Sequence, residues 1–84
     1  MRYFLNIRTK DSLIADPEGD AFSDIDQLLE HAKLVVQELE QEFPVNAEDA
    51  RFILVAMEVV DETGGLVFTL PIHAPEVPND GTRN

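Results

Sequence analysis

The stretch from Arg51 to Leu70, RFILVAMEVVDETGGLVFTL, contains the strongest β-hairpin signal in the chain. Its first half, 51–60, is rich in β-branched and aromatic residues, which is typical of a strand buried on both faces. Segment 61–65, DETGG, is a cluster of turn-forming residues, and 66–70 returns to β-type composition before Pro71 ends it. The stretch therefore predicts two antiparallel strands joined by a tight turn.

The N-terminal segment alternates with the two-residue period of a strand. Tyr3, Leu5 and Ile7 lie on one face. The other face is formed by Arg2, Phe4, Asn6, Arg8 and Lys10. A short second strand is expected at 13–15, and segment 16–20, DPEGD, predicts a turn because proline removes a ladder donor and glycine permits positive φ.

A helix is expected between this turn and the hairpin. Ser23 is a favourable N-cap, and Asp26, three residues later, suits a capping box. Pro44 disfavours helical geometry in the residue before it, so the helix is expected to end near Glu42. One apolar stripe recurs at three- and four-residue steps, formed by Ile25, Leu28, Leu29, Ala32, Val36 and Leu39.

These elements predict one α+β domain over residues 1–72, with β-β-α-β-β order and one helix packed on one face of an antiparallel sheet. Residues 73–84 carry prolines and no apolar period, so a disordered C-terminal tail is expected there. One helix covers one sheet face, and we expect the uncovered face to form an interface with a second copy or a protein partner. The interface candidates are Phe4, Leu34, Phe52 and Leu54.

Charge is distributed unevenly along the 84 residues, which carry a formal net charge of −11. Residues 1–10 hold three basic residues and no acid, whereas 11–50 hold twelve acidic residues against Lys33. Such acidity repels nucleic-acid phosphates and anionic membranes and favours basic partners or cations. The longest apolar runs are far shorter than a membrane span, and no signal peptide is evident, so a cytoplasmic protein is expected.

Few residues offer catalytic chemistry. The chain has no cysteine, which excludes disulfides and thiol catalysis. Ser12 falls in a predicted turn and Ser23 at a helix cap, and neither has the context of a nucleophile. His31 and His73 have no second ligand at metal spacing and are expected to be solvated. We therefore expect a protein that is not an enzyme and has no cofactor.

One acidic group deserves comparison with a cation site. Asp16, Glu18 and Asp20 are weak candidates, because calcium and magnesium take several oxygen ligands. Aligned to an EF-hand loop from Asp16, however, Ala21 takes the glycine position and Gln27 the closing acid position. The preferred interpretation is a turn and a helix start, with no dedicated metal site.

Two motifs resemble a family of short bacterial proteins of unknown function. The segment RYFLNIR (2–8), followed by LIADPEG (13–19), is similar to that family's R-Y-F-F-D-I-R and L-x-x-D-x-E-G. Segment 59–71 is similar to its closing hairpin, V-x-D-E-x-G-x-x-x-x-T-L-P. Departures are Asn6, usually aspartate, and Thr9-Lys10, usually an aspartate-glycine turn. The resemblance covers residues 2–72 and implies the same fold without a known activity.

A remoter similarity links the chain to partial RNase-H-like antitoxins, which open with a tyrosine-containing strand and are often acidic. Asp16-Pro17-Glu18-Gly19 before the helix and Ala32 within it follow that layout. The resemblance implies an inhibitor that masks a toxin or enzyme.

Our leading hypothesis is a small, acidic, non-catalytic interaction or accessory protein that self-associates as a homodimer. One alternative is an antitoxin-like inhibitor that masks a basic protein partner with its acidic face. Another is a weak divalent-cation-binding module centred on Asp16, Glu18 and Asp20. A small-molecule enzyme would need a pocket, which is hard to build with a chain of this length.

Overall fold

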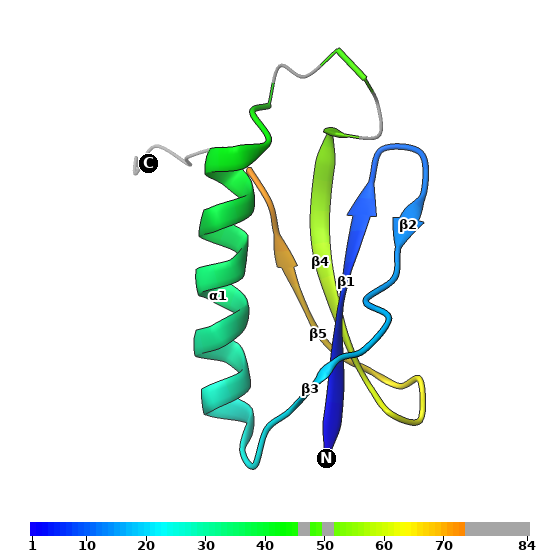
Figure 1. Ribbon diagram of the computed structural model, residues 1–84, viewed down its shortest axis with the longest axis vertical. Helices are drawn as coiled ribbons and strands as arrows, with labels where there is room; N and C mark the ends of the chain where they lie inside the picture. Colours follow the sequence, from blue (N-terminus) through cyan, green and yellow to red (C-terminus); the bar gives the residue numbers. More distant parts are fainter. Residues whose placement is uncertain (46–47, 50–51, 74–84) are drawn as a thin grey trace, which may run out of the picture.

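The computed structural model describes residues 1–45, 48–49 and 52–73, and within them it contains one antiparallel sheet and one helix. Figure 1 shows their arrangement. In chain order they are β1 (Arg2–Thr9), β2 (Leu13–Ile14), β3 (Asp20–Ala21), α1 (Ile25–Glu42), β4 (Leu54–Asp61) and β5 (Leu66–Pro71). The strand order is β2-β1-β4-β5, and β3 also pairs with β1. The predicted α+β fold is confirmed, and β3 is an additional short strand. Of the expected tail, 73–84, only His73 is described, and residues 74–84 lie outside the described residues.

Strand β1 presents the alternation that its sequence predicts. Tyr3, Leu5 and Ile7 stand opposite residues of β4 on the face that α1 packs against, which we call the helix-side face. The opposite face, which we call the outer face, carries Phe4, Asn6 and Arg8 with their β4 partners Val60, Glu58 and Ala56.

A β-bulge changes which residues of β4 face the helix. Arg8 pairs with Ala56, but Thr9 pairs with Leu54, so Val55 is an extra residue in β4. The bulge places Leu54 on the helix-side face, where it is 6% exposed. The strand begins at Leu54, whereas the sequence predicts a start at Arg51, which lies outside the described residues.

The edge of β1 that faces away from β4 is paired with short strands at its two ends, and a side chain caps it between them. Strands β2 and β3 contribute two residues each, and the backbone N–H of Leu5 between them donates to Asp16 Oδ2 at 3.2 Å. The backbone N–H of Asp16 in turn donates to Asn6 Oδ1 at 2.9 Å. A side-chain carboxylate thus replaces a strand backbone acceptor at this point.

Helix α1 begins one residue later than predicted. Its N-cap is Asp24, which has extended backbone geometry and accepts a hydrogen bond from the N–H of Gln27 at 2.8 Å. Ser23 and Asp24 are both good caps, and the sequence does not distinguish them. The helix ends at Glu42 as predicted, with the N–H of Phe43 donating to Leu39 O before Pro44.

The β4–β5 hairpin forms where its turn residues predict. Asp61 Oδ1 accepts hydrogen bonds from Thr63 N, Thr63 Oγ1 and Gly65 N at 2.9, 2.6 and 3.0 Å. The Thr63 hydroxyl and the two backbone donors lower the pKa of Asp61 below its ordinary value. Gly64 has a φ of 86°, which glycine adopts without steric cost.

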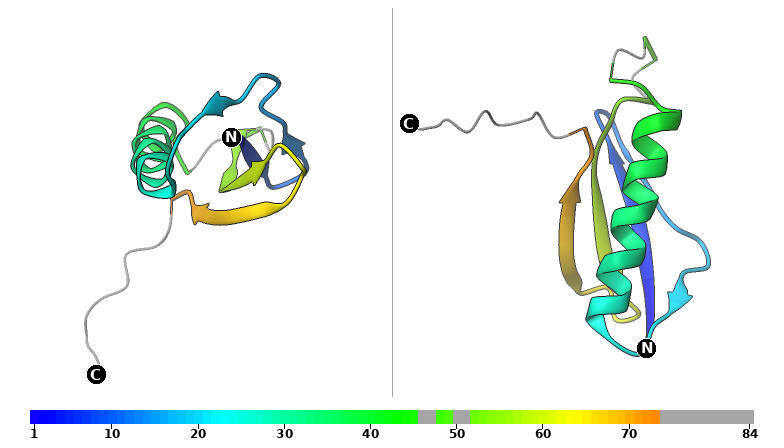
Figure 2. Two further views of the ribbon diagram at one scale, coloured as in Figure 1. Left: turned by 90° about the horizontal axis from the view of Figure 1, so that it is seen from below. Right: turned by 90° about the vertical axis from the view of Figure 1, so that its left-hand side faces the viewer.

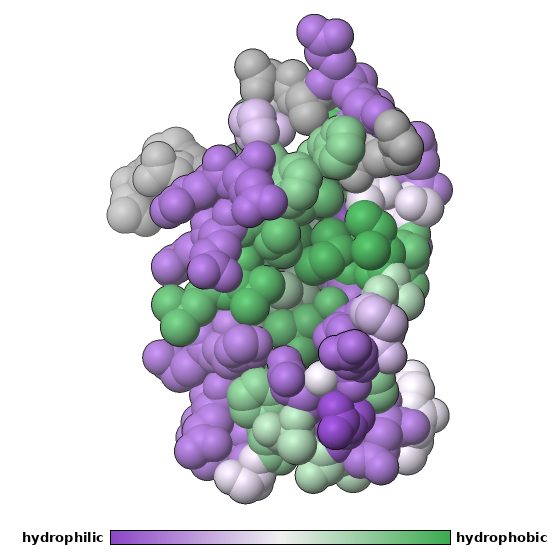
Figure 3. Space-filling model, viewed as in Figure 1, coloured by the Kyte–Doolittle hydropathy of each residue, from purple (hydrophilic) through white to green (hydrophobic). Residues whose placement is uncertain are grey.

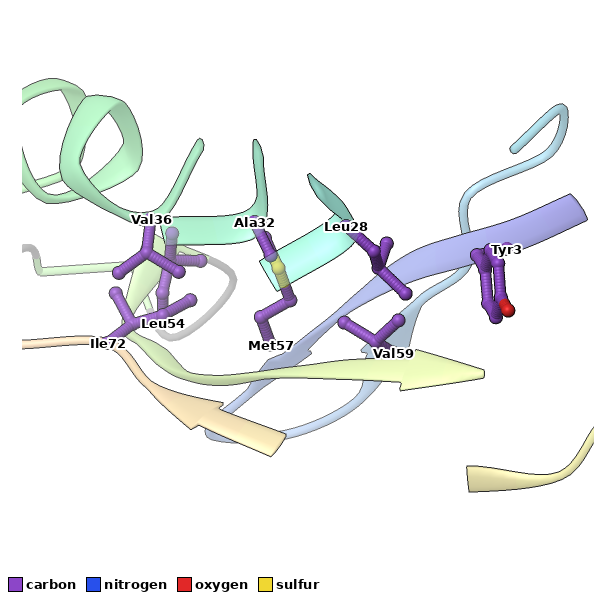
Figure 4. Close-up of a cluster of buried hydrophobic side chains, with 8 residues drawn as sticks. All are labelled: Tyr3, Leu28, Ala32, Val36, Leu54, Met57, Val59 and Ile72. Atoms are coloured by element: carbon purple, nitrogen blue, oxygen red, sulfur yellow. The ribbon is translucent and has the colours of Figure 1, made fainter. Parts of the chain in front are cut away.

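The core fills the space between α1 and the sheet (Figure 4). Leu28, Met57 and Val59 are its largest fully buried side chains. The complete cluster is Tyr3, Leu28, Ala32, Val36, Leu54, Met57, Val59 and Ile72. The helix runs beside β5, at one side of the curled sheet (Figure 2). Part of the helix-side face, next to β1 and β2, therefore lies beyond the width of the helix.

Candidate functional site

An apolar groove occupies the part of the helix-side face that α1 leaves open. Its volume is about 400 Å³, and it is lined by Ile7, Ile14, Leu39, Phe43, Phe52 and Leu54. Ile14 is 51% exposed and Phe52 is 43% exposed, so the groove opens to solvent along its rim. In Figure 3, apolar side chains form a continuous band between α1 and β2 with hydrophilic residues beside it.

Two stacked aromatic rings form one end of the groove. The centroids of Phe43 and Phe52 are 5.7 Å apart, and their planes meet at 8°. Phe43 follows the helix directly, and Phe52 lies two residues before β4, with its N–H donating to Asp49 O at 2.9 Å. The stack therefore joins the end of α1 to the start of β4 and defines the width of the groove there.

His73 fixes the position of Phe43 from the C-terminal side. Its ring Nε2 contacts the carbonyl oxygen of Phe43, and its backbone N–H donates to Glu40 Oε2 at 2.8 Å. The prediction of a solvated His73 is wrong, because this residue is half-buried and bonded to the end of α1. Its partners are about thirty positions away in sequence, so no local pattern marks this role.

Two acidic side chains of α1, Glu38 and Glu42, directly precede the groove residues Leu39 and Phe43 in sequence, and with Gln41 they line a separate depression next to the groove. We call this part of α1 the helical rim. His31, Val35, Glu38 and Glu42 follow each other at steps of four, three and four residues and so form one row along α1. His31 marks the direction of this row, because its ring lies 5.3 Å from that of Phe22, just after β3. The row faces the β2–β3 side of the molecule, where the groove opens. Glu38 and Glu42 are exposed at its C-terminal end.

These carboxylates are placed against the helix dipole. The C-terminal end of a helix carries partial negative charge, and a favourable charge there is typically worth about 0.3–1 kcal/mol, so a carboxylate costs a similar amount. The last turn of α1, which the structure describes completely, holds no basic residue. Neither Glu38 nor Glu42 has an ion-pair partner within the described part of the chain. The interaction of these carboxylates with the end of the helix is thus unfavourable in the isolated domain.

The four interface candidates fall in three places. Phe52 and Leu54 come together in the lining of the groove, with Leu54 buried on its floor. Phe4 is half-buried on the outer face under the 15–19 turn, the connection between β2 and β3, where a Cβ on Gly19 would lie 2.8 Å from its ring. Leu34 is 60% exposed on the solvent side of α1, away from the groove.

The middle of the outer face is polar. Arg8 Nε and Nη2 donate to Glu58 Oε2 and Oε1 at 3.0 and 3.2 Å. The hydrogen bond and the charge of Glu58 raise the pKa of Arg8. Asn6 and Thr69 flank Glu58 on the neighbouring strands. The sequence-based expectation placed the apolar surface on this uncovered outer face, whose centre is polar, whereas the apolar groove lies on the helix-side face.

The acidic turn is an element of the fold. Burial raises the pKa of Asp16, but hydrogen bonds from the backbone N–H groups of Gly19, Leu5 and Glu18 outweigh it, and the pKa lies below its ordinary value. Asp20 Oδ2 lies 4.0 Å from His31 Nε2. In residues 1–45, 48–49 and 52–73, no three His, Cys, Asp or Glu side chains are arranged to hold a metal ion. Asp16, Glu18 and Asp20 are not brought together as ligands.

Fold and groove define a class of small α+β domains with one helix on an antiparallel sheet and an apolar surface beside that helix. The chain belongs to the family described as "Domain of unknown function (DUF6894)", which matches residues 2–73. This match confirms the expectation of a small family of unknown function. No curated protein and no solved structure matches the chain significantly. Among the described residues, no helix is both long and apolar enough to cross a membrane.

Proposed function

We propose that this domain is a non-catalytic interaction protein and that it binds another protein through the apolar groove. The observation that carries the proposal is the open, hydrocarbon-lined groove of about 400 Å³ beside α1. Exposed apolar surface rimmed by polar residues is typical of interaction sites. Burial of such side chains in a complex removes them from water and supplies binding free energy.

The chemistry of the lining supports a binding role. All six lining residues carry hydrocarbon side chains, which supply neither an acid, a base nor a nucleophile. The polar groups with the most defined geometry serve the fold: Asp16 caps the edge of β1, Asp61 shapes the hairpin turn, and Arg8 pairs with Glu58 on the outer face. The groove is open along one side, which suits a side chain or a peptide segment of a partner.

The expectation of self-association remains a prediction, but it has lost its original basis. It rested on an apolar uncovered sheet face, and the outer face has a polar centre at Asn6, Glu58 and Thr69. A dimer formed through the groove would instead bring two acidic helices together, each from a chain of net charge −11. We therefore favour a partner of a different sequence.

The experiment compares two matched surface variants during partner purification from host cells. Ile14→Gln removes an apolar side chain from the groove rim, and Leu66→Gln removes one that is 64% exposed at the far hairpin. The proteins that co-purify with the wild type are purified and titrated against all three forms, and circular dichroism confirms equal folding. We expect Ile14→Gln to weaken binding at least tenfold and Leu66→Gln to leave it unchanged. Equal affinity of both variants for every partner would refute the groove as the binding surface.

A further inference from the structure

We propose that the groove binds a basic amphipathic segment of its partner, with an apolar side chain in the groove and Lys or Arg side chains on Glu38 and Glu42. This inference rests on the proposed function, because it specifies the chemistry of the segment that enters the same groove. An occupant has to match both the hydrocarbon lining and the charges of the rim.

The negative charge of the helical rim favours a positively charged partner segment. Glu38 and Glu42 belong to the row of α1 that faces the groove opening, and both are exposed without an ion-pair partner within the described residues. They also lie beside the negative end of the helix dipole, so a cation placed there interacts favourably with the carboxylates and the helix end together. An anionic or neutral segment would leave the repulsion between these carboxylates and the negative end of the helix dipole in place.

The distance between Glu38 and Glu42 specifies how far apart the two basic residues of the partner segment lie. Glu38 and Glu42 are four residues apart on one helix, which places their side chains about 6 Å apart. Two basic residues one helical turn apart, or two residues apart in an extended chain, match that separation. The apolar residue that enters the groove then lies on the side of the segment that faces the sheet.

The described part of a second copy of this chain does not supply such a segment. Among the described residues the basic side chains are Arg2, Arg8, Lys10 and Lys33. Arg8 is paired with Glu58, and Arg2 donates to the carbonyl oxygens of Glu18 and Gly19. Lys10 stands in the turn after β1 beside Asp11, and Lys33 lies on the acidic helix. Because residues 1–45, 48–49 and 52–73 do not combine clustered cations with a free apolar residue, we assign the segment to a different protein.

The test uses three synthetic peptides with identical leucine positions and all other positions Lys, Gln or Glu. Each has about 14 residues, or four helical turns. Fluorescence anisotropy gives the Kd of each peptide for the full-length protein at low and high salt. We expect the Lys peptide to bind, the Gln peptide to bind at least tenfold more weakly, and the Glu peptide not to bind. Binding of the Lys peptide should weaken as salt rises.

Two double variants distinguish the effect of the rim carboxylates on peptide binding from the effect of the net charge. The double variant Glu38→Gln with Glu42→Gln should weaken the Lys peptide about three- to tenfold, as expected for two exposed ion pairs. The double variant Asp26→Asn with Glu30→Gln removes the same net charge from the other end of the helix and should change the Kd less than twofold. Equal effects of the two double variants, or no binding of the Lys peptide, would overturn the inference.

The groove variant Ile14→Gln distinguishes the inference from the proposed function. If Ile14→Gln abolishes binding of every peptide but the Lys and Gln peptides bind the wild type with equal affinity, the groove is a binding site and the inference of a basic partner is wrong. If the Lys peptide binds equally to wild type and Ile14→Gln, the groove itself is wrong. Light scattering that shows a dimer, lost in Ile14→Gln, would assign the groove to a second copy and overturn the inference.

Discussion

Replacement of Gly19 by alanine tests the close packing of the 15–19 turn against β1. Gly19 has a φ of 70°, and a Cβ built there would lie 2.5 Å from the backbone oxygen of Tyr3 and 2.8 Å from the ring of Phe4. Real Cβ atoms essentially never approach that closely, so the turn or β1 would have to move. Gly64 is the matched control, because its φ is 86° and no atom outside its chain neighbours lies within 4 Å of a Cβ there.

The two substitutions change the free energy of unfolding through the same contributions, except for the steric clash, which occurs only at Gly19. Alanine at positive φ costs about 1–2 kcal/mol at either site. The loss of chain entropy in the unfolded state stabilises both variants equally, by about 0.4–1 kcal/mol. At Gly19, overpacking against Tyr3 and Phe4 adds about 1–3 kcal/mol. Gly19→Ala should therefore be less stable than Gly64→Ala by about 1–3 kcal/mol, which corresponds to at least 4–8 °C in Tm for a domain of about this size.

Urea denaturation followed by circular dichroism measures this difference directly. We expect similar m-values for wild type and both variants, because all expose the same surface on unfolding. Free energies of unfolding that agree within about 0.5 kcal/mol for the two variants would refute the close contact between Gly19 and β1.

Three further comparisons test the helix start, the core and the acid response. Asp24→Ala should lower the free energy of unfolding by about 1 kcal/mol, whereas Ser23→Ala should change it by less than about 0.5 kcal/mol, and the reverse order in thermal melts would reassign the N-cap. Leu54→Ala should cost about 2–5 kcal/mol because its side chain is buried, and Leu34→Ala should stay within about 0.5 kcal/mol, so equal losses in urea denaturation would contradict the bulge that buries Leu54. The pKa of Asp16 is lower in the folded state, so its contribution to stability is complete above the unfolded pKa near 4 and is lost as pH falls through the folded value. Asp16→Asn should therefore flatten the decline of Tm between about pH 5 and 2, and a decline as steep as that of the wild type would exclude this carboxylate as a source of acid sensitivity.

The sequence predicts the elements whose signals are local. The DETGG turn, the stop before Pro44 and the alternation of Tyr3, Leu5 and Ile7 all depend on neighbours within a few positions. The position of the bulge at Val55 is not predictable in the same way. Segment 51–60 is apolar on both faces, so it has no two-residue period from which a phase could be read.

The groove and the extra strand depend on contacts between distant parts of the chain. The groove brings Ile14 together with Phe52 and Leu54, and the phase of Leu54 depends on the bulge. Strand β3 pairs with the start of β1, and the position of that pairing depends on the turn that Asp16 organises. The sequence identified Phe52 and Leu54 as interface candidates by their apolar character, but it provided no means of placing them beside α1.

The capped edge of β1 has a consequence for aggregation and for the mode of recognition. Exposed sheet edges invite strands of other molecules to add by backbone pairing. Here β2, β3 and the Asp16 carboxylate divide that edge into pieces too short to template a foreign strand, and β5, at the other side of the sheet, ends in Pro71, which has no N–H to donate. Under the proposed function, a partner that approaches the groove from the β2 side is consequently selected by its side chains and not by backbone register. Such recognition tolerates different main-chain conformations in the partner, provided that the same side chains reach the surface.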